Sequence, residues 1–418
     1  MLSAEKQLQL MIATHTKISS LFRFDTKPFH SISSFVILVI GLTVLSCNSQ
    51  TSKQSETDSK EDTTQFSREN IEIKYAHGFT ITNFNHYRIA TIYSSTDTKR
   101  DSTTYLLLER GQPKPEGYDH AQLIETPIRS LVAMSSMHIG MLDFLESNAV
   151  LVGLSNTQYV YTPSVIAMID SGKIAEIGRN QGINQEKLIV LNPDLLMTMG
   201  SSNAANKQYP SVAQAGIPML ANSEWLETTP LARAEWVKLL AVLLHKESLA
   251  NEKFEILENQ YNHLLQITKK LSNRPVVLSG INTKDTWYVP TGENYMAHFL
   301  MDAGGTYPWA HTQGQGSIPL NFEAVYPKAL TADIWLNVGF DPNDTQSSLL
   351  GTDQRYADFK AFKTGKVYSY NNRVNDRGSN DFFESGLMAP EVVLADIIKI
   401  LHPQLLPNHG LVYYKQLP

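Results

Sequence analysis

Hydrophobic and polar positions follow two different patterns along this chain, and the change between them marks its parts. The runs Tyr75–Ile81, Tyr87–Tyr93 and Thr103–Glu109 are rich in β-branched and aromatic residues and are separated by polar turn residues. They predict a leading β-hairpin or meander. From Pro127 onward, short apolar runs alternate with segments of helical spacing. This alternation is typical of βαβ units around a mainly parallel sheet that is covered on both faces.

Two sets of alternating strands and helices predict two α/β lobes. The first set has strands at 131–134, 150–153, 194–197 and 217–220 and helices near 137–146, 184–191 and 204–215. The second has strands at 275–278, 287–289, 333–336 and 366–370 and helices near 294–302, 321–328 and 389–401. The fold class expected is therefore α/β, with two lobes that each contain a mainly parallel central sheet.

Between the two sets lies a segment that predicts one long helix. Residues Glu252 to Leu271 contain neither Gly nor Pro, and Lys269 and Lys270 fall in the last turn, where cations favour a helix end. Apolar residues recur there at helical spacing, namely Phe254, Leu257, Tyr261, Leu264, Leu265 and Leu271. Such a helix would be about 35 Å long, which is enough to join two lobes.

The length of the chain agrees with more than one core, because single cores stop growing near ~250–300 residues and this chain has 418. The expected organisation is a signal peptide at 1–46, a tether at 47–68, an N-terminal lobe with its leading hairpin at 69–246, a bridging helix at 247–272 and a C-terminal lobe at 273–418.

The only cysteine, Cys47, follows an uncharged apolar run that is preceded by Lys and Arg residues. The run is shorter than the ~20 residues of a spanning helix and fits the apolar part of an export signal. Val44-Leu-Ser-Cys47 resembles a bacterial lipobox, so we expect Cys47 to be acylated; a transmembrane anchor is the alternative. Residues 48–65 contain no apolar side chain and predict a flexible tether.

Composition and motifs argue against several classes of function. The net charge is −6 and no run of Lys or Arg stands out, so nucleic acid is not an expected partner. The chain has no Gly-x-Ser-x-Gly elbow, dinucleotide fingerprint or P-loop. The histidines after the signal form no His-x-His or His-x-x-x-His pair, so no metal site is expected. We therefore do not expect an enzyme.

The two lobes share a short motif. Asn184-Gln-Glu186 opens one predicted helix and Asn321-Phe-Glu323 opens another, and each helix leads into a strand. Each lobe thus offers one glutamate in the first turn of an equivalent helix. The simpler interpretation is that each carboxylate only complements its helix dipole, which contributes a few tenths of a kcal/mol.

Together these segments resemble the substrate-binding proteins of ABC importers in which two α/β lobes are joined by one rigid helix. The resemblance extends from about Pro127 to His402 and also includes Arg274-Pro-Val-Val-Leu278, Asp302-Ala-Gly-Gly305 and His402-Pro403. That class serves the uptake of iron–siderophore complexes, haem and cobalamin. The resemblance implies a lipid-anchored monomer on the extracytoplasmic side of the cell envelope, with no catalysis and no cofactor.

The resemblance also implies roles for particular residues. Glu186 and Glu323 would pair with arginines of a membrane permease, which works with its ATPase. The ligand would be a metal chelate, and we expect a ferric siderophore. Cobalamin is the first alternative, weakened because Asn180, Met199 and Ser317 are not aromatic where cobalamin-binding members carry Trp or Tyr. Haem is the next alternative.

A bulky chelate between two lobes needs aromatic walls and a few charges. The candidates that follow predicted strands are Tyr159, Tyr161, Trp225, Trp287, Tyr288, Arg373 and Arg377. The arginines suit carboxylate or catecholate oxygens. The alternative for each aromatic residue is core packing, and the arginines could simply be solvated.

Two other classes of function remain open, a hydrolase or metalloenzyme on a similar scaffold and an adhesion lipoprotein.

Overall fold

The structure is a computed structural model that describes residues 70–418 apart from 94–101, 180–181, 201 and 340. The predicted signal peptide, the tether and Cys47 lie outside the described residues. Across the part that is described, no helix has both the length and the apolar character needed to cross a bilayer.

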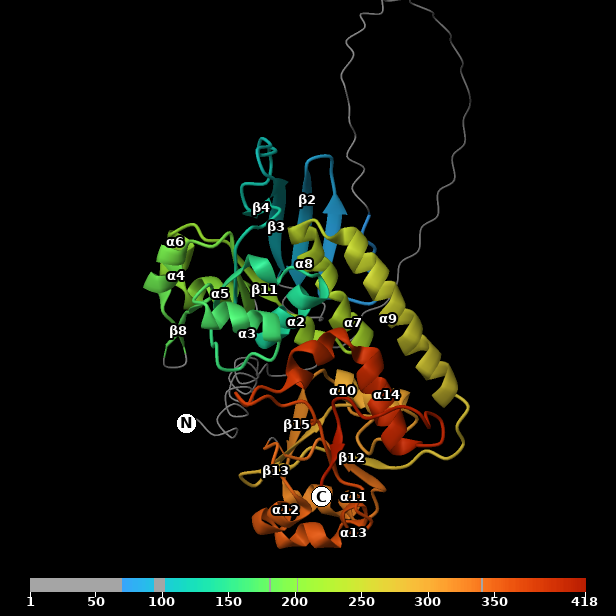
Figure 1. Cartoon of the computed structure of the whole chain (residues 1–418). Helices are drawn as coiled ribbons and strands as arrows, with labels where there is room; N and C mark the ends of the chain where they lie inside the picture. The colour runs from blue at the N-terminus through green and yellow to red at the C-terminus, as the bar shows by residue number, and fades with distance from the viewer. Residues whose placement is uncertain (1–69, 94–101, 180–181, 201, 340) are drawn as a thin grey trace, which may run out of the picture. The chain divides into compact units, whose positions relative to one another are not determined.

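A four-stranded sheet precedes the N-terminal lobe (Figure 1). It contains β1 (Phe79–Asn83), β2 (Tyr87–Tyr93), β3 (Ser102–Glu109) and β4 (Gln122–Thr126), in that order. The first three strands are antiparallel and β4 runs parallel to β3. Alternate residues of β2 are buried, as expected for a sheet with one covered face. The hydrophobic pattern predicted a hairpin or meander here. It missed β4, because polar residues flank the two apolar residues of that strand.

The N-terminal lobe is built on a parallel sheet in the order β11-β10-β5-β6-β7. Its strands are β5 (Leu131–Ala133), β6 (Leu151–Leu154), β7 (Ala175–Glu176), β10 (Leu195–Met199) and β11 (Met219–Asn222), with a small hairpin of β8 (Gly178–Arg179) and β9 (Gly182–Ile183). In β5, Leu131 and Ala133 belong to one buried cluster and Val132 to another. The sheet is therefore covered on both faces, as the continuous apolar runs predicted.

The helices of this lobe are short. They are α2 (Ser136–Phe144), α3 (Pro163–Asp170), α4 (Gln185–Leu191), α5 (Ser202–Gln208), α6 (Pro210–Gln214), α7 (Pro230–Glu235) and α8 (Val237–Leu244), with 3₁₀ turns η1 (Asn148–Val150) and η2 (Glu224–Leu226). The single helix predicted at 204–215 is split before Pro210, because proline lacks an N–H and suits the first position of a new helix.

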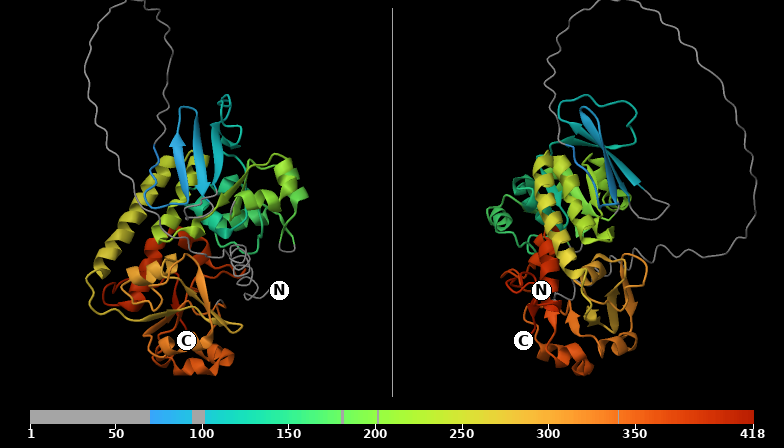
Figure 2. Two further views of the ribbon diagram at one scale, coloured as in Figure 1. Left: turned by 180° about the vertical axis from the view of Figure 1, so that it is seen from behind. Right: turned by 90° about the vertical axis from the view of Figure 1, so that its right-hand side faces the viewer.

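One helix, α9 (Glu247–Thr268), leads from the first lobe to the second (Figures 1 and 2). It lies within the predicted bridging segment. Its buried residues recur every three to four positions and include Ala250, Phe254, Leu257, Tyr261 and Leu264. At 1.5 Å per residue its 22 residues span about 33 Å. Its buried face packs against α8 and against the C-terminal helix α14 (Pro390–Leu401).

The C-terminal lobe combines parallel and antiparallel strands. β12 (Val277–Ser279) pairs in parallel with β16 (Ile334–Leu336). An antiparallel sheet of β13 (Asn282–Thr283), β14 (Thr286–Pro290) and β15 (Ser317–Leu320) stands apart, and β17 (Tyr368–Ser369) pairs with β18 (Lys415–Gln416). The other helices are α10 (Tyr295–Asp302), α11 (Phe322–Ala329), α12 (Gln346–Thr352) and α13 (Lys360–Lys363), with η3 (Gln354–Asp358), η4 (Asp381–Phe383) and η5 (Ser385–Met388).

The two lobes contact each other through α2 and α7 on one side and η5, α10 and α14 on the other. Gly140 in α2 marks the closest approach: a Cβ atom at this position would lie 2.1 Å from the carbonyl oxygen of Glu384. Only glycine fits there, so the backbones of the two lobes touch directly.

Candidate functional site

Glu186 is exposed in the first turn of α4. The side chain of Asn184, the N-cap residue, accepts a hydrogen bond of 2.9 Å from the backbone N–H of Lys187. This cap fixes where the helix begins and places Glu186 where the helix dipole favours an anion. Within the described residues Glu186 has no ion-pair partner. The ammonium group of the neighbouring Lys187 binds the Glu176 carbonyl oxygen instead, at 2.7 Å.

Glu323 occupies the same position in α11 of the other lobe. Asn321 caps that helix and accepts a hydrogen bond of 2.9 Å from the Ala324 N–H. The Glu323 side chain is 73% exposed and lies 3.5 Å from a guanidinium nitrogen of Arg355. Arg355 is itself held by Asp353 at 2.7 Å. The shared motif therefore has a shared geometry, but of the two glutamates only Glu323 has an ion-pair partner among the described residues.

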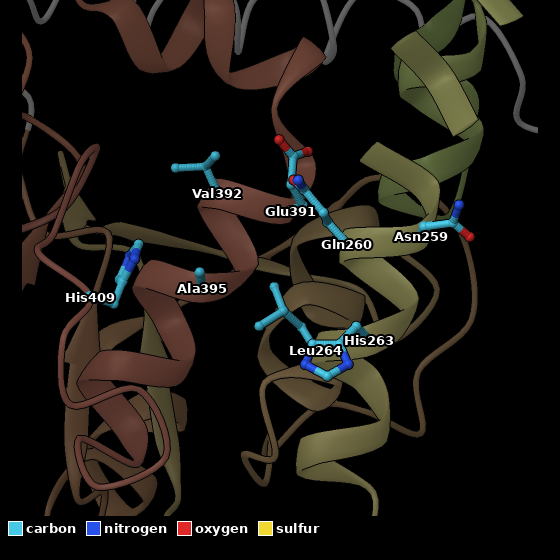
Figure 3. A pocket seen from close by; sticks show the side chains of 8 residues that line it. All are labelled: Asn259, Gln260, His263, Leu264, Glu391, Val392, Ala395 and His409. Carbon is cyan, nitrogen blue, oxygen red and sulfur yellow. The ribbon is translucent and has the colours of Figure 1, made fainter. Parts of the chain in front are cut away.

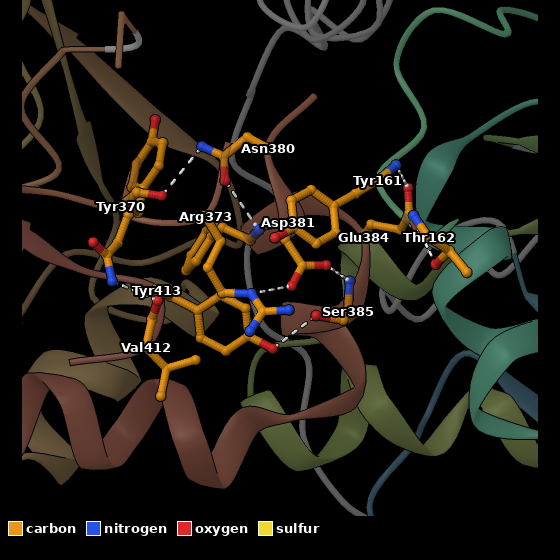
Figure 4. Close-up of polar contacts among 12 residues, drawn as sticks. Tyr161, Thr162, Tyr370, Arg373, Asn380, Asp381, Glu384, Ser385, Val412 and Tyr413 are labelled. Carbon is orange, nitrogen blue, oxygen red and sulfur yellow. Dashed lines mark hydrogen bonds and ion pairs between the residues drawn. The ribbon is translucent and has the colours of Figure 1, made fainter. Parts of the chain in front are cut away.

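Arg373 and Tyr161, predicted from opposite lobes, lie together at the lobe interface (Figure 4). The guanidinium carbon of Arg373 is 5.3 Å from the centre of the Tyr161 ring. Asp381, whose side chain is 2% exposed, binds the Nε of Arg373 at 2.6 Å. The carboxylate thus orients the guanidinium through Nε only, and the two terminal amino groups stay available on a side chain that is 44% exposed.

Next to this pair, Glu384 of the C-terminal lobe caps helix α3 of the N-terminal lobe (Figure 4). Its carboxylate accepts hydrogen bonds from the backbone N–H groups of Tyr161 at 2.8 Å and Thr162 at 2.7 Å, and from the Thr162 hydroxyl. Thr162, the N-cap residue, makes no capping bond of its own. Burial raises the pKa of Glu384, against the lowering effect of these bonds.

The other end of α3 is also held from the C-terminal lobe. One terminal nitrogen of Arg377 binds both carboxylate oxygens of Asp170, at 2.7 and 2.8 Å. Asn375 donates a hydrogen bond of 2.9 Å to the Val160 carbonyl oxygen. The segment 373–385, called the strap below, therefore binds α3 at both ends.

The remaining aromatic candidates do not gather at this place. Tyr159 is half-buried in the loop that leads to Tyr161, and Trp225 is half-buried in η2. Tyr288 is half-buried in β14, on the opposite face of the strand from Trp287.

Trp287 does not have the ligand-binding role that the sequence predicted for it. It is 0% exposed, its ring is stacked 5.7 Å from that of Trp335, and its Nε1–H donates to the Ser279 carbonyl oxygen at 3.0 Å. A side chain enclosed in this way contributes to the core of the C-terminal lobe and offers no surface to a ligand. For Trp287 the alternative interpretation, core packing, is therefore the correct one.

Sequence reasoning missed a buried polar cluster at the carboxyl ends of β5 and β11. Arg233 of α7 lies 3.3 Å from Glu224 and its guanidinium carbon lies 3.9 Å over the Tyr295 ring of the other lobe. Glu224 and His138 are both 0% exposed. Burial raises the pKa of Glu224 and lowers that of His138 to about 3. The signal available in the sequence was Arg233 itself, a lone cation in the apolar segment Pro230-Leu-Ala-Arg-Ala234.

A surface groove of about 440 Å³ lies between α9 and α14 (Figure 3). It is lined by Asn259, Gln260, His263, Leu264, Glu391, Val392, Ala395 and His409. Burial raises the pKa of Glu391 to about 7, and one of its carboxylate oxygens has no hydrogen-bond partner. His409 is bound to Asp396 at 2.7 Å. Among the described residues no group of three or more His, Cys, Asp or Glu side chains is arranged to hold a metal ion.

Comparison with known proteins gives the family. A family of periplasmic binding proteins matches residues 132–374, from β5 to the start of the strap. An uncharacterized lipoprotein of Methanocaldococcus jannaschii is 28% identical over 316 residues, which is 72% of this chain and 72% of the relative.

Two solved structures share the fold. The molybdate periplasmic binding protein MolA of Haemophilus influenzae has a TM-score of 0.53 at 18% identity and covers 69% of this chain and 90% of its own. The periplasmic heme binding protein HutB of Vibrio cholerae has a TM-score of 0.51 at 17% identity, covering 66% and 99%. Since the family match covers more than half of the chain, the protein belongs to the periplasmic binding protein family, and one helix, α9, bridges its two lobes.

Proposed function

We propose that this protein captures an iron complex of the siderophore type between its two lobes and delivers it to an ABC permease. The observation that supports the ligand class is Arg373. Its guanidinium is oriented by the buried Asp381 and keeps two terminal amino groups, a geometry suited to a pair of catecholate or carboxylate oxygens. The Tyr161 ring faces it from the other lobe and would supply an aromatic wall.

The proposal gives Glu186 and Glu323 the task of docking. Each is an exposed anion at the start of a capped helix, one in each lobe. Two such charges, one on each lobe, would set the register on arginines of the permease and speed the encounter. Acylation of Cys47 would keep the protein at the extracytoplasmic face of the membrane, and the lipoprotein relatives are consistent with this anchor.

Binding measurements test the ligand class. Purified protein is titrated with a ferric trishydroxamate, a ferric triscatecholate, haem and cyanocobalamin, and tryptophan fluorescence is followed. We expect micromolar or tighter binding of one of the ferric siderophores. Tighter binding of haem or cobalamin would replace the iron complex with that ligand, and no response to any of the four would count against capture of a bulky chelate.

A matched pair of arginine variants locates the ligand. Arg373→Ala removes the guanidinium at the lobe interface. Arg355→Ala is the control, because Arg355 is also half-exposed and also held by an aspartate but lies beside α11. Weaker binding in the first variant and unchanged binding in the second would support the site proposed here.

A further inference from the structure

The N-terminal sheet ends in a group of aromatic side chains that lies outside the region matched by the family. The turn between β1 and β2 and the loop between β3 and β4 project side by side from the same end of the sheet (Figures 1 and 2). The Phe84 ring stacks on Tyr87 with a centroid distance of 4.5 Å and an interplanar angle of 11°. Tyr118 meets Tyr87 edge-on at 5.5 Å. These rings form one continuous surface.

A further exposed apolar side chain, Leu123, lies on the same face of the sheet as Tyr87. It pairs with Leu106, which lies two residues from Leu108, the partner of Tyr87, so Leu123 and Tyr87 share a face. We call Phe84, Tyr87, Tyr118 and Leu123 the aromatic tip. Phe84 is 40% exposed and Leu123 is 38% exposed. Apolar side chains gathered in this way, rather than scattered singly, point to a partner.

The place where the chain enters the fold indicates which partner this is. The Asn83 side chain donates a hydrogen bond of 3.2 Å to the side chain of Asn70, and Asn251 donates one of 3.1 Å to the Asn70 carbonyl oxygen. Asn83 is the last residue of β1 and directly precedes Phe84. The chain that comes from Cys47 therefore reaches the folded part beside the aromatic tip.

The length of the intervening chain keeps the tip near an anchor. Residues 48–69 separate Cys47 from Asn70, and the tether that the sequence predicts here would have an end-to-end distance of about 25 Å. With Cys47 acylated, the tip would be held close to the bilayer surface. A tether of the predicted kind would raise the effective concentration of the tip at the bilayer into the millimolar range, so even weak contacts would be populated.

The charges around the tip favour lipid over an anionic partner. Lys114 is paired with Asp119 at 3.1 Å, and His86 lies 3.8 Å from Glu109. Among the described residues these positive groups are matched by anions, which leaves no excess of positive charge to attract acidic headgroups. Phenylalanine, tyrosine and leucine without such a charge suit the boundary between headgroups and acyl chains, where tyrosine keeps its hydroxyl in water.

We propose that the aromatic tip rests on the bilayer to which Cys47 is anchored, with Phe84 and Leu123 at the depth of the lipid headgroups. This contact rests on the anchor that forms part of the proposed function, and it holds the folded part in a defined orientation. It involves neither Glu186 nor Glu323, so membrane contact and permease docking use separate surfaces.

The test uses the full-length lipidated protein in vesicles of phosphatidylcholine. Acylation blocks the thiol of Cys47, the only native cysteine, so one introduced cysteine carries an environment-sensitive dye. Phe84→Cys probes the tip. Ile256→Cys, at a 52% exposed position on α9, is the matched control. We expect a blue-shifted emission and quenching by spin-labelled lipid at position 84 and neither at position 256, at low and at high salt.

Two results would overturn the proposal. Emission at position 84 that is as water-like as that at position 256 would show that the tip does not meet lipid. Shielding of position 84 only when permease is present in the vesicles would make the tip a protein contact. A second label, at Leu123→Cys, guards against a local effect at Phe84. Mass spectrometry of Cys47 is read separately, so a missing anchor is distinguished from a tip that fails to bind.

Discussion

Arg377 of the C-terminal lobe and Asp170 of the N-terminal lobe form an ion pair in which one guanidinium nitrogen lies 2.7 and 2.8 Å from the two carboxylate oxygens. Asp170 is the last residue of α3, whose first turn is capped by Glu384 of the same strap. The lobes are thus joined by two devices, the bridging helix α9 and the clamp on α3. Together they oppose a large rotation of one lobe against the other.

Exchanging the charges of this pair tests the clamp. The side chains of Arg377 and Asp170 are 33% and 59% exposed, so the pair contributes only about 0.2–1 kcal/mol to the free energy of unfolding. We expect Asp170→Arg to lower stability, and the double variant Asp170→Arg with Arg377→Asp to recover most of the loss. Urea denaturation measures both. A double variant as unstable as the sum of the two single variants would show that the contact does not couple the lobes.

Removing the carboxylate of Glu384 tests the other end of the clamp. Glu384 is 0% exposed and accepts bonds from two backbone N–H groups that are partly buried, so Glu384→Ala leaves both donors without this acceptor. Each such donor costs about 1–3 kcal/mol. We expect a loss of stability of this order and a broader distribution of distances between spin labels on the two lobes. Glu384→Gln keeps one acceptor oxygen and should lie between the two proteins.

The clamp shows where reasoning from sequence reaches its limit. The strands, the bridging helix and the two Asn-x-Glu helix starts follow from local patterns of hydrophobicity and capping, and they could be predicted. The contacts of Glu384 with Tyr161 and Thr162 join residues more than 220 positions apart. No local period encodes such a contact, so the strap could not be identified in advance.

The aromatic residues show a related limit. Tyr161 and Trp287 both follow or belong to strands and have similar neighbours in the sequence. The structure places Tyr161 beside Arg373 and Trp287 in the core. The two faces of β14 differ in burial, since Trp287 is buried and its neighbour Tyr288 is only half-buried. The sequence pattern suggested a strand of the parallel set, whereas β14 pairs antiparallel with β15.

Trp287→Ala should therefore act on stability. Removing a fully buried Trp leaves a cavity and costs about 3–5 kcal/mol. Tyr288→Ala, at the half-buried neighbouring position, is the control and should cost less. Thermal unfolding of the two variants provides the measurement. If Trp287→Ala left the melting temperature unchanged, the packing of Trp287 against Trp335 would not describe the folded protein.

Glu391 gives a prediction about pH. Burial raises its pKa to about 7 from the ordinary 4.5. The folded protein therefore holds a proton there that the unfolded chain releases above pH 4.5, so this group stabilises the fold most at low pH. Its contribution is lost as the pH rises towards 7, and it amounts to a few kcal/mol at most, since one pKa unit corresponds to about 1.4 kcal/mol.

The variant Glu391→Gln isolates that contribution. It keeps the shape of a protonated carboxyl group and cannot ionise. We expect the difference in stability between variant and native protein, measured by urea denaturation, to grow in favour of the variant from pH 5 to pH 8. His263 and His409 line the same groove and are common to both proteins, so they do not contribute to the difference to first order. A constant difference across this range would contradict the raised pKa.

Replacing Glu186 and Glu323 is expected to impair docking on the permease without changing ligand binding. Both side chains are exposed and neither lies at the lobe interface, so replacing both by Ala should leave ligand affinity unchanged and stability within about 0.5 kcal/mol. Transport by the cognate permease should be lost, because the charges that set the register are gone. Transport in vesicles and binding in solution are measured on the same preparations. Loss of ligand affinity in the purified double variant would falsify the docking assignment.

The single variants should differ, because Arg355 lies 3.5 Å from Glu323 and the described residues place no ion-pair partner on Glu186. Arg355 offsets part of the charge that Glu323 can present, and the offset weakens as salt screens the pair. We expect Glu186→Ala to reduce transport more than Glu323→Ala at low salt. Arg355→Ala should increase the rate of association with the permease. A reduced rate in that variant would mean that Arg355 itself contacts the permease. The permease would then recognise Glu323 and Arg355 together.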